Sequence, residues 1–398
     1  MSTGQISDGR ARRARIGTAT CFLLTGFIFA TFASRVPAVK ENLGLTNGQL
    51  AIGFVGLNAG AILGLQLGGM LVPRTGSRPA LAVALLAFAG VLLLPAIVPN
   101  LPTLVAALLL LAVFNSVVDV AMNAQGVTGQ KLMGRPVLSG MHAMHSLGGV
   151  LGAGAGALAA HLDAGPPLHF LTTTGVAGIA SLAVSPLLLP SREDAEDGPS
   201  VDGNGTVVAD ISEWFRGWSL PMAVIGALAF CFTLAEGAAL DWSAVYVSDS
   251  LGGSASLSAV GLGVFLGAVT LGRLAGDRLV SRFGAVRVFW VGAVTAGAGF
   301  GSALLINTPP AGVVGLGLLG AGIANALPLA IGAAGNAPGE APATAAARVS
   351  TFAYLGSFVG PALIGALATV WRLPLALALP AVLVLATAFG ARAVRRAG

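Results

Sequence analysis

Long apolar runs separated by short polar breaks fill most of the chain. Gly, Pro and charged residues bound twelve such runs, each close to or longer than the ~20 residues that a helix needs to cross a bilayer. The runs cover residues 16–36, 47–72, 79–98, 103–129, 139–161, 167–189, 220–246, 256–275, 286–306, 310–334, 347–370 and 373–393. The pattern predicts an all-α membrane protein with twelve transmembrane helices.

Residues 191–219 form the one long hydrophilic segment between these runs. Seven acidic residues lie in it among Gly, Pro, Ser and Asn, a composition typical of a flexible linker. Six apolar runs precede the segment and six follow it. We therefore expect an N-terminal six-helix bundle over residues 1–190, a cytoplasmic linker over 191–219 and a C-terminal six-helix bundle over 220–398.

Composition and charge exclude other classes of protein and indicate an orientation. Charged residues make up 9% of the chain, whereas a soluble domain carries about 25%. With the N-terminus in the cytoplasm, 18 of the 21 Lys and Arg fall on the cytoplasmic side, and only Arg35, Lys40 and Arg372 fall outside. The net charge of +5 therefore indicates topology, with both termini cytoplasmic, and not a nucleic-acid partner.

The two halves contain an internal repeat. A shift of 208 residues aligns the second apolar run with the eighth without a gap, and an Arg-x-Gly triplet follows both runs. The coinciding pairs include Gly53 and Gly261, Gly64 and Gly272, Gly68 and Gly276, Arg74 and Arg282, and Gly76 and Gly284. Equal halves with matching runs predict two pseudo-symmetric bundles.

Two loop sequences resemble those of a known family. The stretch Gly69-Met-Leu-Val-Pro-Arg-Thr-Gly-Ser-Arg78 resembles the signature G-x-x-x-D-[RK]-x-G-[RK] between spans two and three of the major facilitator superfamily. Residues 276–287 resemble its echo between spans eight and nine. Six spans, a linker and six spans extend the resemblance over essentially the whole chain. Residues 119–126 and 139–149 are similar to a bacterial branch near the fucose permeases and the rhizopine membrane protein MosC.

The resemblance implies a gating role for the charged residues of these two loops, namely Arg74, Arg78, Asp277, Arg278 and Arg282. Pro73 and Ser281 stand where the signature has Asp, and Asp277, one helical turn earlier, could substitute for it in the second copy. The alternative is that these arginines only determine topology.

Polar residues inside the apolar runs are the main functional candidates, because they are costly in hydrocarbon. Asn115, Asp119 and Asn123 share one helix face at spacing i, i+4, i+8, and such a stripe must face a cavity or a polar neighbour. Asp119 is the first candidate for proton coupling because a desolvated carboxyl favours its protonated form. The alternative is a stripe of structural hydrogen bonds.

Two further groups of residues carry weaker hypotheses. His142 and His145 could titrate or bond to Asp119, although both could simply stand at a wet helix entrance. Arg35 could close an outer gate by a salt bridge to Glu236 or Asp241, and Glu236 is also a candidate for proton coupling; the alternative places Arg35 and Asp241 among lipid headgroups. Further candidates for contact with a solute are Asn58, Gln66, Asn325 and Tyr354.

These observations together favour a secondary active transporter that moves a small solute across a bacterial inner membrane by alternating access, with protons as coupling ion. The chain contains no G-x-x-x-x-G-K-[ST] loop for ATP. The resemblance suggests a sugar- or polyol-like solute, and the alternative is efflux of a drug-like or antibiotic compound. A membrane-embedded enzyme or a solute receptor is more remote. We expect a monomer, free thiols at Cys21 and Cys231, no cofactor and no metal site.

Overall fold

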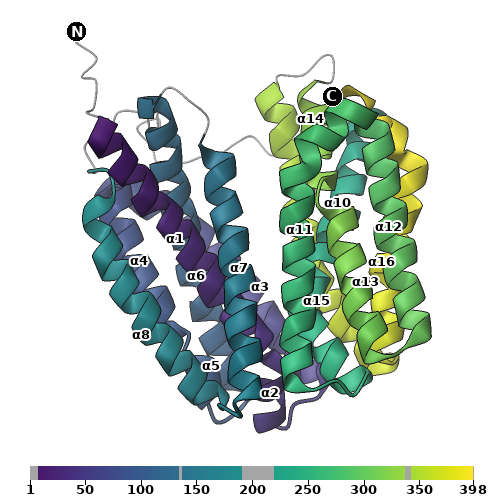
Figure 1. Cartoon of the computed structure of the whole chain (residues 1–398), viewed down its shortest axis with the longest axis horizontal. Coiled ribbons are helices and arrows are strands. Elements are labelled where there is room, and N and C mark those ends of the chain that lie inside the picture. Colours follow the sequence, from purple (N-terminus) through teal and green to yellow (C-terminus); the bar gives the residue numbers. More distant parts are fainter. Residues whose placement is uncertain (1–7, 134–136, 191–218, 337–341, 398) are drawn as a thin grey trace. The chain divides into compact units, whose positions relative to one another are not determined.

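The computed structural model describes residues 8–133, 137–190, 219–336 and 342–397, and over these ranges the secondary structure is helical without a β-strand (Figure 1). Twelve helical segments of the described chain are long and apolar enough to cross a membrane, and they match the twelve predicted runs one for one. The predicted fold class is therefore confirmed. The predicted linker falls on residues 191–218, which lie outside the described ranges.

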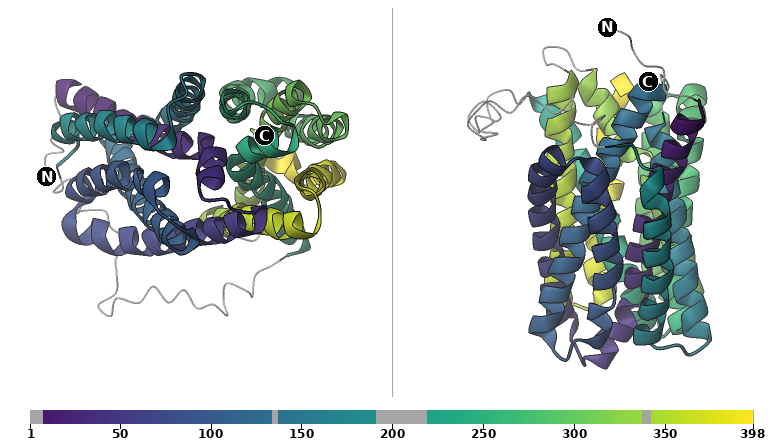
Figure 2. Two further views of the ribbon diagram at one scale, coloured as in Figure 1. Left: turned by 90° about the horizontal axis from the view of Figure 1, so that it is seen from below. Right: turned by 90° about the vertical axis from the view of Figure 1, so that its left-hand side faces the viewer.

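The first of two compact units comprises Met1–Leu45 and Ile52–Asn204. Its long helices run alongside one another (Figure 2). Its elements are α1 (Asp8–Ser34), α2 (Val36–Asn42), α3 (Asn47–Thr75), α4 (Ser77–Val91), α5 (Leu94–Ile97), α6 (Leu101–Met133), α7 (Leu138–His161), α8 (Pro166–Val184) and the 3₁₀ turn η1 (Ser185–Leu187).

The second unit comprises Gly205–Gly398 together with Thr46–Ala51, the start of α3. Three of its spans are composite, because a second helical element continues each of α10, α13 and α16. Its elements are α10 (Leu220–Val245), the π-helix η3 (Tyr246–Ser250), α11 (Ala255–Phe283), α12 (Ala285–Ile306), α13 (Pro309–Ile323), α14 (Ala326–Gly335), α15 (Pro342–Val370), α16 (Leu373–Ala386) and the 3₁₀ helix η4 (Thr387–Ala397).

Glycines on α7 bring that helix against the backbone of α1. A Cβ on Gly148 would overlap the carbonyl oxygen of Leu23, and a Cβ on Gly152 would overlap that of Phe27. Helices in a bilayer gain little hydrophobic free energy from meeting each other, so small residues that allow close van der Waals contact decide where they pack. The glycine positions on α7 therefore fix its register on α1.

The second unit repeats this contact between α15 and α10. Gly356 and Gly360 stand 208 residues after the two glycines of α7, and a Cβ on either would overlap the carbonyl oxygen of Phe230 or Leu234. The repeat that the sequence shows for spans two and eight thus extends to spans five and eleven.

The same shift relates the contacts of α3 with α6 to those of α11 with α13. A Cβ on Gly53 would lie 3.2 Å from Leu108, and a Cβ on Gly261 would lie 3.3 Å from Leu316, which stands 208 residues after Leu108. Because glycine and partner shift together, the repeat is a property of the packing as well as of the sequence, and it confirms two pseudo-symmetric bundles.

The paired glycines of the two signature loops adopt one backbone conformation. Gly76 has φ 85° and ψ 155° before α4, and Gly284 has φ 79° and ψ 150° before α12. A positive φ is accessible to glycine and strained for residues with a Cβ. The turn between the two helices therefore requires glycine in both copies of the signature.

We expect Gly148→Val to destabilise the first bundle by about 1–3 kcal/mol, because the added side chain would force α1 and α7 apart. The matched control is Gly154→Val on the same helix, where a Cβ would meet nothing within 4 Å. Thermal unfolding of the purified protein in detergent would compare the two variants. Equal melting temperatures would show that this contact does not hold the helices in register.

Candidate functional site

Helix α6 carries the polar stripe that the sequence predicts. Asn100 starts the helix by accepting a bond from the Thr103 amide at 3.1 Å. On the stripe itself, the Asn123 Nδ2 donates to Asp119 Oδ1 at 3.1 Å and to the Asp119 carbonyl oxygen at 2.8 Å. The structure gives Asp119 no ion pair among the described residues, so an amide of its own helix is the group that holds this carboxyl.

The first residue of the stripe has spare hydrogen-bonding capacity. The Oδ1 of Asn115 is buried, and no described residue donates to it. A buried amide oxygen without a donor costs about 1–3 kcal/mol, and such groups are common where a protein receives a ligand or a water molecule. Asn115 therefore fits the predicted role of a cavity residue, which stays a prediction.

Another face of α6 has a structural polar residue. Gln125 is fully buried, and its Nε2 donates to Ser77 Oγ at 2.6 Å and to the Leu189 carbonyl oxygen at 3.0 Å. Its Oε1 accepts from the Leu189 amide at 2.9 Å. These three bonds tie α6 to the start of α4 and to the end of the first bundle, so Gln125 belongs to the packing of the bundle.

The two histidines of α7 face α1. The exposed His142 ring meets the Phe22 ring edge-on with centroids 5.0 Å apart, and the carbonyl oxygen of the half-buried His145 lies against Gly26. Within the described residues no three His, Cys, Asp or Glu side chains form a group that could hold a metal ion. Cys21 and Cys231 are both free thiols.

Arg35 is buried between α1 and α2 and binds the far end of α7. Its Nη2 donates to the Ala164 carbonyl oxygen at 2.6 Å and its Nη1 to the Gly156 carbonyl oxygen at 3.5 Å. Helix C-terminal carbonyls carry partial negative charge and attract a cation. The guanidinium thus has partners inside its own bundle, and the salt bridge to Glu236 or Asp241 stays a prediction.

Glu236 on α10 forms an ion pair with Arg273 on α11, with 3.0 Å between Oε1 and Nη2. The side chains are 26% and 42% exposed, so the pair is partly solvated. Arg273 lies inside the predicted eighth run, residues 256–275, and inside the helical span Ala255–Gly276. It can lie there because Glu236 neutralises it.

Asp241 and Trp242 lie one and a half turns further along α10. Asp241 is 6% exposed and Trp242 is fully buried. The indole Nε1 of Trp242 donates to the Pro361 carbonyl oxygen at 3.0 Å, which joins α10 to α15. The structure therefore buries Asp241 within the second bundle.

The arginines of the two signature loops lie at the surface of their units. Arg74 lies in the last turn of α3 and is exposed, Arg78 lies in the first turn of α4 and is half-buried, and Arg278 and Arg282 are exposed on α11. The Arg282 guanidinium lies 5.3 Å from the centroid of the Phe283 ring. Asp277 lies on α11, but its side chain is outside the described part of the structure.

The remaining solute candidates lie in different surroundings. Asn58 is half-buried on α3, Gln66 is exposed on the same helix, and Tyr354 is 57% exposed on α15 with its ring stacked near Phe358. Asn325 stands at the break between α13 and α14 and donates from Nδ2 to the Gly272 carbonyl oxygen at 3.0 Å. Asn325 therefore braces an interrupted helix.

Sequence reasoning missed a buried histidine in the first bundle. His169 on α8 is 6% exposed, and neither ring nitrogen has a hydrogen-bond partner among the described residues. The signal was available, since His169 stands inside the sixth apolar run.

Comparisons with known proteins identify the family to which this chain is similar. A family model described as the Major Facilitator Superfamily matches residues 18–280. An uncharacterised MFS-type transporter of Yersinia pestis is 35% identical over 385 residues, 96% of this chain and 96% of that protein. Membrane protein MosC of Rhizobium meliloti is 24% identical over 87% of this chain and 82% of its own length. The resemblance seen in the loop signatures is therefore confirmed.

Solved structures share the fold at low sequence identity. The nucleoside transporter NupG gives a TM-score of 0.75 at 13% identity, covering 96% of this chain and 98% of its own. A D-xylose–proton symporter gives 0.71 at 16% identity, covering 96% and 97%. The transporter FucP in its outward conformation gives 0.61 at 17% identity, covering 95% and 97%.

We expect Arg273→Gln to lower the melting temperature, because it leaves the Glu236 carboxylate without its cation in a membrane-spanning helix. The double variant Arg273→Gln with Glu236→Gln should have a melting temperature higher than that of Arg273→Gln alone. The coupling in the double-mutant cycle is expected to be about 1 kcal/mol, since the pair is partly exposed. Arg278→Gln, an exposed charge on the same helix, serves as control. Strictly additive losses would show that the pair contributes nothing.

Proposed function

The chain belongs to the Major Facilitator Superfamily, and we propose that it is a secondary transporter that moves a small polar solute by alternating access, driven by protons. The family and its solved members support transport as the activity. The repeated packing of the two bundles supports the mechanism, because alternating access in such proteins moves one repeat against the other around a site near the bilayer midplane.

The surroundings of Asp119 carry the proposal of proton coupling. The carboxyl lies in the middle of a membrane-spanning helix, and its described partner is the neutral amide of Asn123. A carboxylate without a counter-ion in hydrocarbon is costly, so its protonated form is favoured until the residue meets water. Alternate exposure of Asp119 to water on the two sides would then load and release a proton. Glu236, already paired with Arg273, and His142, exposed near Phe22, are the secondary candidates.

A sugar- or polyol-like solute fits the stripe on α6. Two amides and a carboxyl on one helix face offer both donors and acceptors to hydroxyl groups. The transporters of similar fold that are described for D-xylose and for nucleosides handle hydroxyl-rich molecules. Efflux of an antibiotic is the competing activity, and the screen below includes it.

The orientation completes the proposal. We place the chain in a bacterial inner membrane with both termini in the cytoplasm, as the distribution of Lys and Arg supports. The exposed arginines of the signature loops and Arg35 then serve as gate residues on opposite sides. One chain supplies both repeats, so a monomer suffices for transport.

We expect a thermal-stabilisation screen of the purified protein to find a hydroxyl-rich ligand when pentoses, hexoses, polyols, nucleosides and antibiotics are tested side by side. A ligand that stabilises the protein should accumulate in reconstituted vesicles when a proton gradient is imposed. Stabilisation by antibiotics alone, with export in vesicles, would replace the sugar hypothesis with efflux.

Asp119→Asn should abolish gradient-driven accumulation of that ligand down to the level seen without a gradient, because the amide cannot carry the proton. Downhill counterflow of the ligand should persist. The matched control is Asp163→Asn, which makes the same chemical change at an exposed loop residue with φ 53°, a conformation that Asn tolerates. Accumulation that survives Asp119→Asn unchanged would exclude this residue from coupling.

A further inference from the structure

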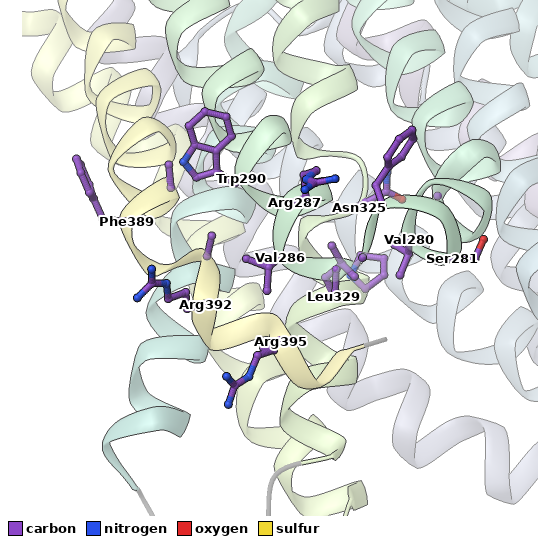
Figure 3. A pocket seen from close by; sticks show the side chains of 17 residues that line it. Val280, Ser281, Val286, Arg287, Trp290, Asn325, Leu329, Phe389, Arg392 and Arg395 are labelled. Carbon is purple, nitrogen blue, oxygen red and sulfur yellow. The ribbon is translucent and has the colours of Figure 1, made fainter.

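An open pocket of about 1270 Å³ lies at one end of the second bundle (Figure 3). The end of α11, the start of α12, α14 and η4 surround it. Three arginines line it, namely Arg287, Arg392 and Arg395, and no acidic residue is among its described lining. The pocket is therefore a concave cationic surface on a membrane-spanning bundle.

The geometry of η4 gathers two of these arginines. A 3₁₀ helix has three residues per turn, so side chains three positions apart stand above one another. Phe389, Arg392 and Arg395 have this spacing and follow one another along η4 (Figure 3). Both arginines are exposed, and the described residues offer neither of them an acidic partner in an ion pair. Their charge is thus available to a ligand.

A narrower apolar groove of about 410 Å³ adjoins the pocket between α11, α12 and α13. Phe283, Arg287 and Asn325 line both spaces, so one opens beside the other. Most of the groove is apolar, with Leu279 and Val291 among its walls. The two spaces together suit a molecule that has an anionic head and an apolar tail.

Aromatic side chains stand at the edge of the pocket. Phe389 is 94% exposed and Trp290 is 49% exposed, and both line it. Exposed aromatic residues next to arginines at the end of a transmembrane bundle are typical of the level at which lipid headgroups lie. Inorganic phosphate has no apolar part and would gain nothing from these rings or from the apolar groove.

We propose that this pocket binds an anionic phospholipid, with its headgroup phosphate on Arg287, Arg392 and Arg395 and one acyl chain in the apolar groove. Guanidinium groups bind phosphate oxygens through charge-assisted, often bidentate hydrogen bonds. Basic pockets between transmembrane helices bind anionic headgroups by this chemistry. The proposal concerns a lipid site and is independent of the solute that the protein moves.

The test is native mass spectrometry of the full-length, delipidated protein titrated with dioleoyl phosphatidylglycerol. Dioleoyl phosphatidylcholine, with the same chains and a headgroup of no net charge, is the parallel titration. We expect tighter binding of phosphatidylglycerol, and a loss of about tenfold in its affinity when Arg392→Gln and Arg395→Gln are combined. Arg372→Gln, an exposed arginine before α16, should leave the affinity unchanged.

A second variant distinguishes a lipid-binding site from a site for a free anion. Val291→Trp fills the apolar groove from an exposed position and should weaken phosphatidylglycerol binding without altering charge, whereas Val314→Trp, also exposed but outside the groove, should not. Equal binding of the two lipids, or full binding by the double arginine variant, would overturn the proposal. So would displacement of phosphatidylglycerol by millimolar inorganic phosphate together with no effect of Val291→Trp, since that result indicates a site for free phosphate.

Discussion

Close contact between glycine and a neighbouring carbonyl oxygen is the constraint on which the two bundles depend. In hydrocarbon, lipid tails solvate an apolar helix as well as another helix does, so association needs contacts that lipid cannot replace. Gly148 brings α7 against α1, and Gly356 brings α15 against α10, each at a backbone distance that no residue with a Cβ allows. The large glycine content, 57 residues, therefore serves close helix packing and is not a sign of disorder.

The same constraint limits where polar chemistry can lie. Where helices pack this closely, a charge inside a span needs a partner nearby, and three of the charged groups in the spans have one within their own bundle. Glu236 has Arg273, Arg35 has the carbonyl oxygens near the end of α7, and Asp119 has the amide of Asn123. Of the two carboxyl groups among these, Glu236 is paired with a cation, whereas Asp119 is held by a neutral amide.

The sequence was sufficient to predict those features of the fold that follow from hydrophobic periodicity and composition. Twelve apolar runs predicted the twelve spans, and one alignment of Gly and Arg predicted a repeat that the contacts confirm. The sequence could not predict which spans pack against one another, because apolar runs do not reveal which face of a helix meets which neighbour. The ion pair of Glu236 with Arg273 and the bonds of Arg35 to the carbonyl oxygens of Gly156 and Ala164 therefore emerge only from the structure. The cationic pocket was equally hidden, since the spacing of Arg392 and Arg395 gains meaning only once η4 is known to be a 3₁₀ helix.

The internal repeat also shows which contacts the two bundles share and at which positions their side chains differ. Glycine contacts survive at a shift of 208 because they depend on backbone atoms, which every sequence supplies. The ionisable groups inside the spans are not repeated: Leu327 stands where the shift places Asp119, and Leu65 stands opposite Arg273. A carboxyl held by an amide thus occurs in one bundle and an ion pair in the other. Since a fold does not by itself determine function, the positions at which the two halves differ, and not those at which they agree, are where coupling and solute recognition should be sought.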